Sequence, residues 1–284
     1  MFVQLAAFSP FASAALRCEN LFSSIQPDIL PTFLTNTNAN LYELQRDEVN
    51  RRTESGLKRT NRELLKAVED YRPTYHEGRA YSISWAQLQS LISHVNEHPV
   101  VGESAVGKYQ PEDVDIAYCF GRSAYLHLLL SHMGLQKQSI LKVWSVGSMR
   151  APSADKFWGF HVTDVVLVSG YGWMAIDTNT RRIQPLRHWF NHQAEMSVDG
   201  RLRFYVTAAE KFGVTTGKYD RIQMGLDLPK RRDWYQHYFV DMMKTLRTAS
   251  LAEQGLKRIP LSPRPPPTRP SETGLWTRAK DFLF

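Results

Sequence analysis

Apolar residues in the first half of the chain recur every three or four positions, the spacing of an amphipathic helix. The predicted helices span residues 41–71, 84–98 and 115–133. The segment 41–71 is one long helix or two shorter ones broken near Ser55-Gly56. Pro99 ends the segment 84–98, and Gly134 ends the segment 115–133, which is apolar almost throughout.

Beyond residue 134 the pattern changes to short apolar runs typical of β-strands. The segment Ser169–Gly172 carries a hairpin turn signal between two of them. The predicted strands span residues 140–146, 158–168, 173–177 and 201–206, and two later helices span 185–193 and 233–248. Helices that precede strands without βαβ alternation indicate an α+β fold.

Charge and cysteine content narrow the class of protein. The 284 residues carry a net charge of +7, but basic and acidic residues are mostly interleaved, as on solvated helix faces, so we expect no nucleic-acid partner. With only Cys18 and Cys119, a disulfide framework is not expected, and the protein should work in a reducing compartment such as the cytosol. No apolar run is long enough for a membrane span.

Cys119 lies near the start of the third predicted helix. Unpaired amides and the positive end of the helix dipole favour a thiolate at such a position. The acidic stretch 112–115 can cap the helix, and Gly121 leaves room for a substrate to approach the backbone. The alternative is an inert cysteine packed in the core.

His161 and Asp177 follow on two successive predicted strands. Their numbers sum to 338, which centres a hairpin on residue 169, so they are expected to be cross-strand neighbours. Asp164 is a rival partner for His161, but three residues along a strand its side chain should point to the opposite face. A thiol, a base and an orienting carboxylate in this order predict a catalytic triad.

Five short segments resemble those of bacterial protein glutaminases, the protein-glutamine deamidases: Tyr118–Ala124, Leu141–Trp144, Trp158–Val162, Ile176-Asp177 and Pro185–Trp189. The resemblance covers about residues 112 to 195. It implies a papain-like or transglutaminase-like core, in which a helix-borne cysteine packs on an antiparallel sheet, and it carries over Cys119, His161 and Asp177 as catalytic residues. This chain departs from the family in its low cysteine content and in Thr178, where proline is expected.

The resemblance implies hydrolysis of a glutamine side-chain amide in a protein substrate, through a cysteine thioester and with release of ammonia. A cysteine peptidase or a transglutaminase on the same core is the alternative. Trp158, Trp144 and Gly121 are predicted to contact the substrate, although core packing is the other reading of the tryptophans. No cofactor or metal is expected. The low cysteine content suggests an enzyme of the cytosol, or an effector delivered into another cell.

Two motifs compete with the triad. Residues 94–98 have the H-x-x-E-H spacing of a zinc site, but Pro99 follows directly and a third ligand cannot be assigned. Residues 102–108 have the spacing of a phosphate-binding loop but continue with Tyr109, so the hydroxyl that would bind magnesium is missing.

The predicted organisation is a helical N-terminal arm (1–80), a catalytic domain (81–250) and a proline-rich tail (251–284). The proline density of the tail favours an extended polyproline conformation. Residues 259–270 are either a stiff spacer or a ligand for a proline-recognising partner. A non-catalytic interaction protein that acts through this tail is the alternative from another functional class.

Overall fold

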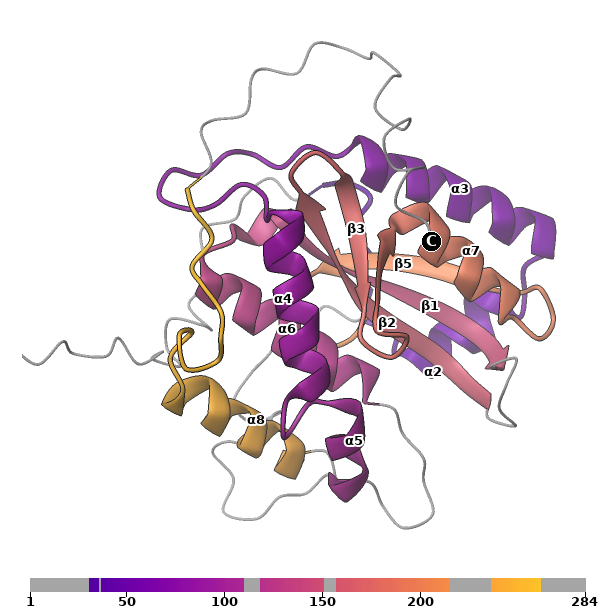
Figure 1. The fold of residues 1–284 in the computed structure, drawn as a ribbon. Helices are drawn as coiled ribbons and strands as arrows, with labels where there is room; N and C mark the ends of the chain where they lie inside the picture. The colour runs from indigo at the N-terminus through magenta and orange to yellow at the C-terminus, as the bar shows by residue number, and fades with distance from the viewer. Residues whose placement is uncertain (1–30, 36, 110–117, 151–156, 215–235, 262–284) are drawn as a thin grey trace, which may run out of the picture.

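A five-stranded antiparallel sheet with helices on both faces forms the centre of the molecule (Figure 1). The computed structural model describes residues 31–35, 37–109, 118–150, 157–214 and 236–261. The strand order is β4-β3-β2-β1-β5. This arrangement confirms the α+β class. In the described part of the chain, no helix has the length and apolar character needed to cross a membrane.

The N-terminal helices form where local signals place them, with one correction. The predicted break lies before Ser55-Gly56, because the Thr53 hydroxyl accepts a hydrogen bond from the Gly56 N–H and begins the next helix there. The elements of this region are α2 (Leu41–Leu44), a π-helix (Gln45–Val49) and α3 (Glu54–Asp70).

The helices that follow match their predicted segments closely. Ser84 and Gln87 form a capping box at the start of α4 (Trp85–Glu97). Gly134, with φ of 102°, ends α6 (Cys119–Met133). The other helices are α7 (Leu186–Glu195), α8 (Gln236–Thr248), the short α5 (Glu103–Val106) and 3₁₀ turns at Gly107–Tyr109 and Lys137–Ser139.

The sheet contains β1 (Ile140–Arg150), β2 (Phe157–Val168), β3 (Gly172–Asp177), β4 (Arg182–Pro185) and β5 (Arg203–Ala208). The short β4 was not predicted from the sequence. In the β2–β3 hairpin, Val168 pairs with Gly172 and Asp164 with Ile176, so paired numbers sum to 340. The predicted sum of 338 is therefore wrong by two, because the turn is centred on Gly170.

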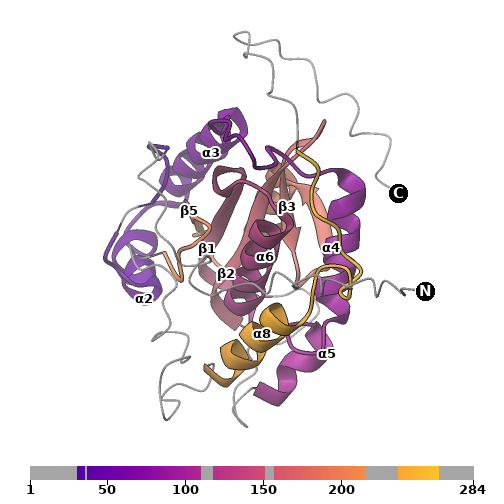
Figure 2. The same cartoon turned by 90° about the vertical axis from the view of Figure 1, so that its left-hand side faces the viewer.

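Alternation along the strands assigns each residue to one of the two faces. In β1, β2 and β3, even-numbered residues such as Val166 and Val168 pack with α4, α6 and α8, whereas odd-numbered residues such as Val165 and Leu167 pack with α3 and α7. Figures 1 and 2 show these two helical layers on either side of the sheet.

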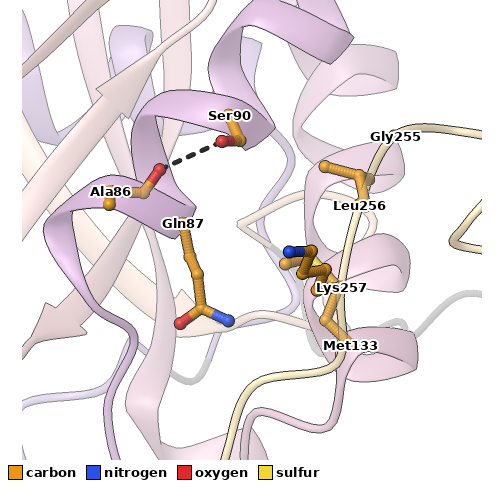
Figure 3. A pocket seen from close by; sticks show the side chains of 7 residues that line it. All are labelled: Ala86, Gln87, Ser90, Met133, Gly255, Leu256 and Lys257. Atoms are coloured by element: carbon orange, nitrogen blue, oxygen red, sulfur yellow. Dashed lines mark hydrogen bonds between the residues drawn. The ribbon is translucent and has the colours of Figure 1, made fainter.

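The flanking segments also contribute to the core. Val68 of α3 is buried on the odd-numbered face of the sheet. Leu256 and Ile259 of the predicted tail are buried with α4 and α6, and the chain at Gly255–Lys257 runs close to α4 (Figure 3). The boundaries at residues 80 and 250 stay predictions. The proline-rich stretch beyond Leu261 lies outside the described residues.

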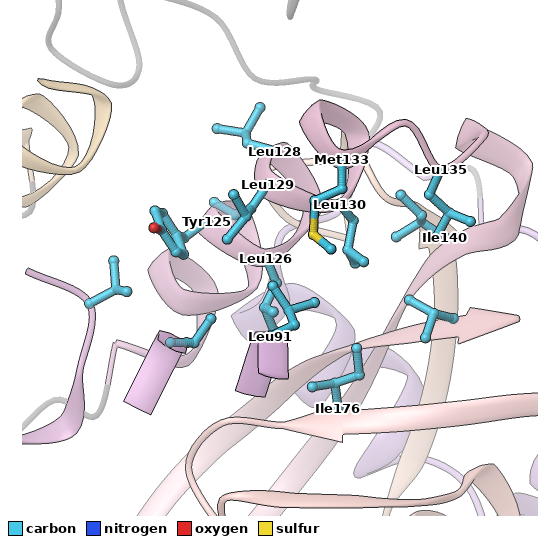
Figure 4. Close-up of a cluster of buried hydrophobic side chains, with 14 of the residues drawn as sticks. Leu91, Tyr125, Leu126, Leu128, Leu129, Leu130, Met133, Leu135, Ile140 and Ile176 are labelled. Atoms are coloured by element: carbon cyan, nitrogen blue, oxygen red, sulfur yellow. The ribbon is translucent and has the colours of Figure 1, made fainter. Parts of the chain in front are cut away.

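The largest buried cluster surrounds α6. Its leucines pack on strand residues such as Ile140 and Ile176 and on Leu91 of α4 (Figure 4). Of the fifteen residues of α6, twelve are buried. A helix enclosed on nearly all sides has little freedom to shift, so whatever its N-terminus carries is held firmly against the sheet.

Candidate active site

Cys119 is the first residue of α6, and Tyr118 before it adopts a left-handed backbone conformation with φ of 51°. Such a conformation is uncommon for a non-glycine residue and costs on the order of 1–3 kcal/mol. The buried Tyr118 side chain is anchored by a hydrogen bond from its hydroxyl to the Tyr109 carbonyl. The chain therefore turns sharply into the helix at Cys119.

The first described residue of the helix start is Tyr118, whose side chain makes no capping hydrogen bond. The Arg122 N–H is bonded to the Tyr118 carbonyl over 2.9 Å. The acidic stretch 112–115, which was expected to supply the cap, lies outside the described residues. The positive end of the helix dipole is thus directed at the residues around the Cys119 thiol.

His161 and Asp177 form a buried pair. His161 Nε2 lies 3.0 Å from Asp177 Oδ2, and the two side chains are 7% and 0% exposed. With a pairing sum of 340, the position opposite His161 is residue 179, so the two side chains are diagonal neighbours on one face. Diagonal neighbours are within reach of a long side chain. His161 and Asp177 are therefore in contact, as predicted, although the predicted strand register was wrong.

The Asp177 carboxylate accepts four hydrogen bonds. Its Oδ2 accepts from His161 and from Trp189 Nε1, the latter over 2.8 Å. Its Oδ1 accepts from the backbone N–H groups of Asn179 and Thr180, over 3.0 and 3.3 Å. These bonds use all the acceptor capacity of an ionised carboxylate and fix its orientation.

Burial and pairing act in opposite directions on this pair. Burial alone would raise the pKa of Asp177, but His161, Trp189 and the Thr180 N–H hold it below its ordinary value. Burial alone would lower the pKa of His161, but Asp177 and Cys119 raise it above its ordinary value. The ionised forms of both side chains are therefore favoured.

The Cys119 thiol lies close enough to the His161 ring to raise the pKa of His161. Because Nε2 of the imidazole faces Asp177, the other ring nitrogen, Nδ1, is the one available to the thiol. The structure thus brings Cys119, His161 and Asp177 together. β3 ends at Asp177, before the position that would pair with His161. Beyond this end, no β3 residue separates the two faces, and the Cys119 thiol can reach the His161–Asp177 pair.

Asp164 lies on the opposite face of β2 from His161. Its register partner is Lys142 on β1. Burial raises the pKa of Asp164 to about 7, in spite of the opposing effects of Lys142 and Ser123. Asp177 rather than Asp164 is therefore the carboxylate that orients the His161 ring.

Three residues near the site were not assigned by sequence reasoning. Trp189 of α7 donates to Asp177, and its ring lies 6.0 Å from that of His161. Arg122 is 2% exposed and donates to the Thr178 carbonyl over 3.1 Å. Tyr118 supplies the turn before the cysteine. Their positions near the motifs were the only signal, since each contact depends on the tertiary fold.

The predicted substrate contacts need correction. Trp144 is 1% exposed, and its Nε1 donates to Thr207 Oγ1, so it is a core residue. The space beside Gly121 is occupied by Tyr238 of α8, whose Cε1 would lie 2.4 Å from a Cβ at this position. Trp158 is half-buried beside the cluster on the α3 and α7 face, and its contact with a substrate stays a prediction.

The competing motifs have other partners in the fold. His94 Nε2 lies 2.8 Å from the Tyr125 hydroxyl, and His98 Nδ1 accepts from the Val100 and Val101 N–H groups. Within the described ranges, no cluster of three or more histidine, cysteine or acidic side chains could hold a metal ion. Glu103, in the second motif, forms an ion pair with Arg181.

A pocket of about 230 Å³ lies between α4 and residues 255–257 (Figure 3). Met133, which lines it, is fourteen residues after Cys119 on α6, so about 21 Å of helix separates them. This pocket is therefore remote from the thiol.

No protein-family model matches this chain, and no curated protein sequence matches it. Among solved structures it is similar to protein-glutaminases. The NMR structure of protein-glutaminase from Chryseobacterium proteolyticum has 15% identity and a TM-score of 0.37, with 60% of this chain and 90% of that chain covered. A crystal structure of protein-glutaminase has 18% identity and a TM-score of 0.39, with coverage of 68% and 98%. A crystal structure of pro-protein-glutaminase has 15% identity and a TM-score of 0.41, with coverage of 69% and 70%.

Proposed function

We propose that this protein is a cysteine-dependent amide hydrolase that deamidates glutamine side chains in a protein substrate. The observation that carries the proposal is the buried His161–Asp177 pair, whose imidazole also interacts with the Cys119 thiol. A thiol, an imidazole and a buried carboxylate in this relation are the parts of a nucleophilic acyl-transfer site. The choice of glutamine rests on the motif resemblance to protein glutaminases.

The reaction would begin with attack of a Cys119 thiolate, paired with the His161 imidazolium, on the carboxamide carbon. The backbone N–H of Cys119, at the start of α6, is one donor for the oxyanion. The His161 imidazolium would then protonate the departing nitrogen, which leaves as ammonia and gives a thioester.

Hydrolysis of the thioester would complete the cycle. His161, neutral after the first step, accepts a proton from water as the water attacks the thioester carbonyl. The C–S bond breaks, the thiolate and the imidazolium are restored, and glutamate is the product. Throughout, Asp177 holds the imidazole orientation and stabilises its charged form.

The test measures ammonia release from a glutamine-rich protein by the wild type and by Cys119→Ala. Cys18→Ala is the matched control, because it removes the only other cysteine. We expect Cys119→Ala to abolish release and Cys18→Ala to retain it. Equal release by wild type and Cys119→Ala would refute the thiol mechanism.

Mass spectrometry of the treated substrate separates the related reactions. Conversion of glutamine to glutamate in an intact chain supports deamidation. Cleaved chains would instead indicate a peptidase, and cross-linked chains a transglutaminase. Deletion of residues 262–284 should leave ammonia release unchanged, whereas a protein that acts through its proline-rich tail would lose its function.

A further inference from the structure

Arg122 is a buried cation that the proposed reaction does not use. It lies three residues after Cys119, about one turn along α6, and is 2% exposed. Its Nη1 donates to the Thr178 carbonyl over 3.1 Å, and its Nε has no hydrogen-bond partner among the described residues. Because arginine keeps its proton in proteins, a full positive charge is buried here.

Two of the groups around this charge belong to the site. Burial lowers the pKa of Arg122, and the neighbours that counteract this are Tyr238, Glu103, Cys119 and Asp177. In the part of the chain that the structure describes, no carboxylate lies within ion-pair distance of the Arg122 guanidinium. A buried charge without a direct partner is costly unless its surroundings carry a net opposite charge.

The candidate site supplies part of that compensation. The hydrogen bonds to Asp177 favour its ionised form, and the Arg122 charge and the Asp177 carboxylate attract each other. Because a cation beside a thiol favours the thiolate, the reactivity of Cys119 reports on the Arg122 charge.

The hydrogen bond of Arg122 also ties two elements together. Thr178 follows Asp177 directly, at the start of the turn between β3 and β4. The same turn donates two backbone N–H groups to Asp177. A bond from the first turn of α6 to this turn therefore sets the spacing between the thiol and the carboxylate, which the His161 ring has to bridge.

We propose that Arg122 is a positioning residue for the site of Cys119, His161 and Asp177. It holds the turn after Asp177 against the start of α6 and places a buried positive charge beside the Asp177 carboxylate and the Cys119 thiol. This inference rests on the proposed thiol chemistry but is tested without a substrate.

The test follows the rate at which iodoacetamide alkylates Cys119, by intact mass in a Cys18→Ser background, from about pH 5 to about pH 9. Arg122→Met removes both charge and donor, Arg122→Gln removes the charge but keeps a donor, and Arg122→Lys keeps the charge. Arg79→Met is the matched control, because Arg79 also donates to a backbone carbonyl, that of Ser131, near the opposite end of α6. Thermal unfolding shows which variants are folded.

We expect Arg122→Met and Arg122→Gln to slow alkylation at neutral pH by about tenfold or more and to shift its pH profile. Arg122→Lys should stay within about threefold of the wild-type rate, and Arg79→Met should match it. If Arg122→Met does not fold, the comparison of Arg122→Gln with Arg122→Lys decides.

A folded Arg122→Gln variant with the wild-type rate and pH profile would overturn the proposal. So would an Arg122→Lys variant as slow as Arg122→Gln, because a cation would then not be what the site requires. A wild type that alkylates at Cys119 but releases no ammonia from any protein would refute the deamidase function, and the alkylation rates would still decide the role of Arg122.

Discussion

Substitution of Gly121 by alanine tests how α8 attaches to the helix that carries the thiol. A Cβ at this position would lie 2.4 Å from Tyr238 Cε1 and 2.9 Å from Cζ. Since carbon atoms reach optimal contact only at about 3.5 Å, the ring would have to retreat by about 1 Å. Tyr238 and its neighbour Phe239 are both 0% exposed, so there is little room for this movement.

The expected cost follows from two opposing effects. Overpacking of this size destabilises a core by about 1–3 kcal/mol. Replacement of glycine by alanine in a helix returns at most about 1 kcal/mol. Gly121→Ala should therefore lower the free energy of unfolding by about 1–2 kcal/mol, which corresponds to a fall in Tm of about 3–6 °C for a chain of this size.

Urea and thermal unfolding measure this change. Gly107→Ala is the matched control, because nothing lies within 4 Å of a Cβ there, and it should stay within about 0.5 kcal/mol of the wild type. In a Tyr238→Ala background the ring is gone, so Gly121→Ala should cause no further loss. An equal loss in both backgrounds, or none in the wild type, would refute the packing argument. A higher KM without lost stability would instead restore the interpretation that Gly121 faces a substrate.

Three further predictions concern the buried charges. The pKa of Asp177 is lowered, so its contribution to stability is lost as pH falls through the folded value; that of His161 is raised, so its contribution is lost as pH rises through the folded value. The stability lost in Asp177→Asn, measured by urea unfolding across pH, should thus be largest between the ordinary values of 3.8 and 6.5, and a pH-independent loss would contradict the pairing. Trp189→Phe keeps a ring beside the imidazole but removes the donor to the charged Asp177 carboxylate. We expect the free energy of unfolding to fall by about 1.5–3 kcal/mol and ammonia release to decrease. Unchanged values would show that the Trp189 donor does not support Asp177. Lys142 and Asp164 are buried register partners whose charges attract each other. The stability losses of Lys142→Met and Asp164→Leu should therefore not add, and the double variant should differ from their sum by about 0.5–3 kcal/mol in urea unfolding; strictly additive losses would show that the two do not interact.

The elements with strong local signals were predictable from the sequence. The long apolar runs gave β1 and β2, and the Ser84 cap and Pro99 bounded α4, because each signal acts within a few residues. The four-residue β4 has no such run and ends in a proline, so only its pairing with β3 reveals it. The hairpin register was wrong because Gly170 and Gly172, both at positive φ, set a three-residue turn whose geometry is not encoded in apolar spacing.

The three proposed catalytic residues were predictable from the sequence, but the residues that hold them in position were not. The order of Cys119, His161 and Asp177 and the short motifs around them are visible in the sequence. The left-handed Tyr118 and the donors Trp189 and Arg122 act through contacts between distant elements. Gly121 and Trp144 illustrate the reverse error, since small and aromatic residues beside a motif can equally serve the packing of a helix or a sheet.

The early end of β3 has a consequence for how this protein can be altered. Because a helix carries the thiol and two strands of the sheet carry the imidazole–carboxylate pair, no single element can be transferred with a complete site. A graft of α6 onto another sheet would carry a nucleophile without its base, and loosening of the packing of α7 would disturb Asp177 through Trp189. Substitutions at exposed positions should therefore be tolerated, whereas buried substitutions on either face of the sheet should also impair the site.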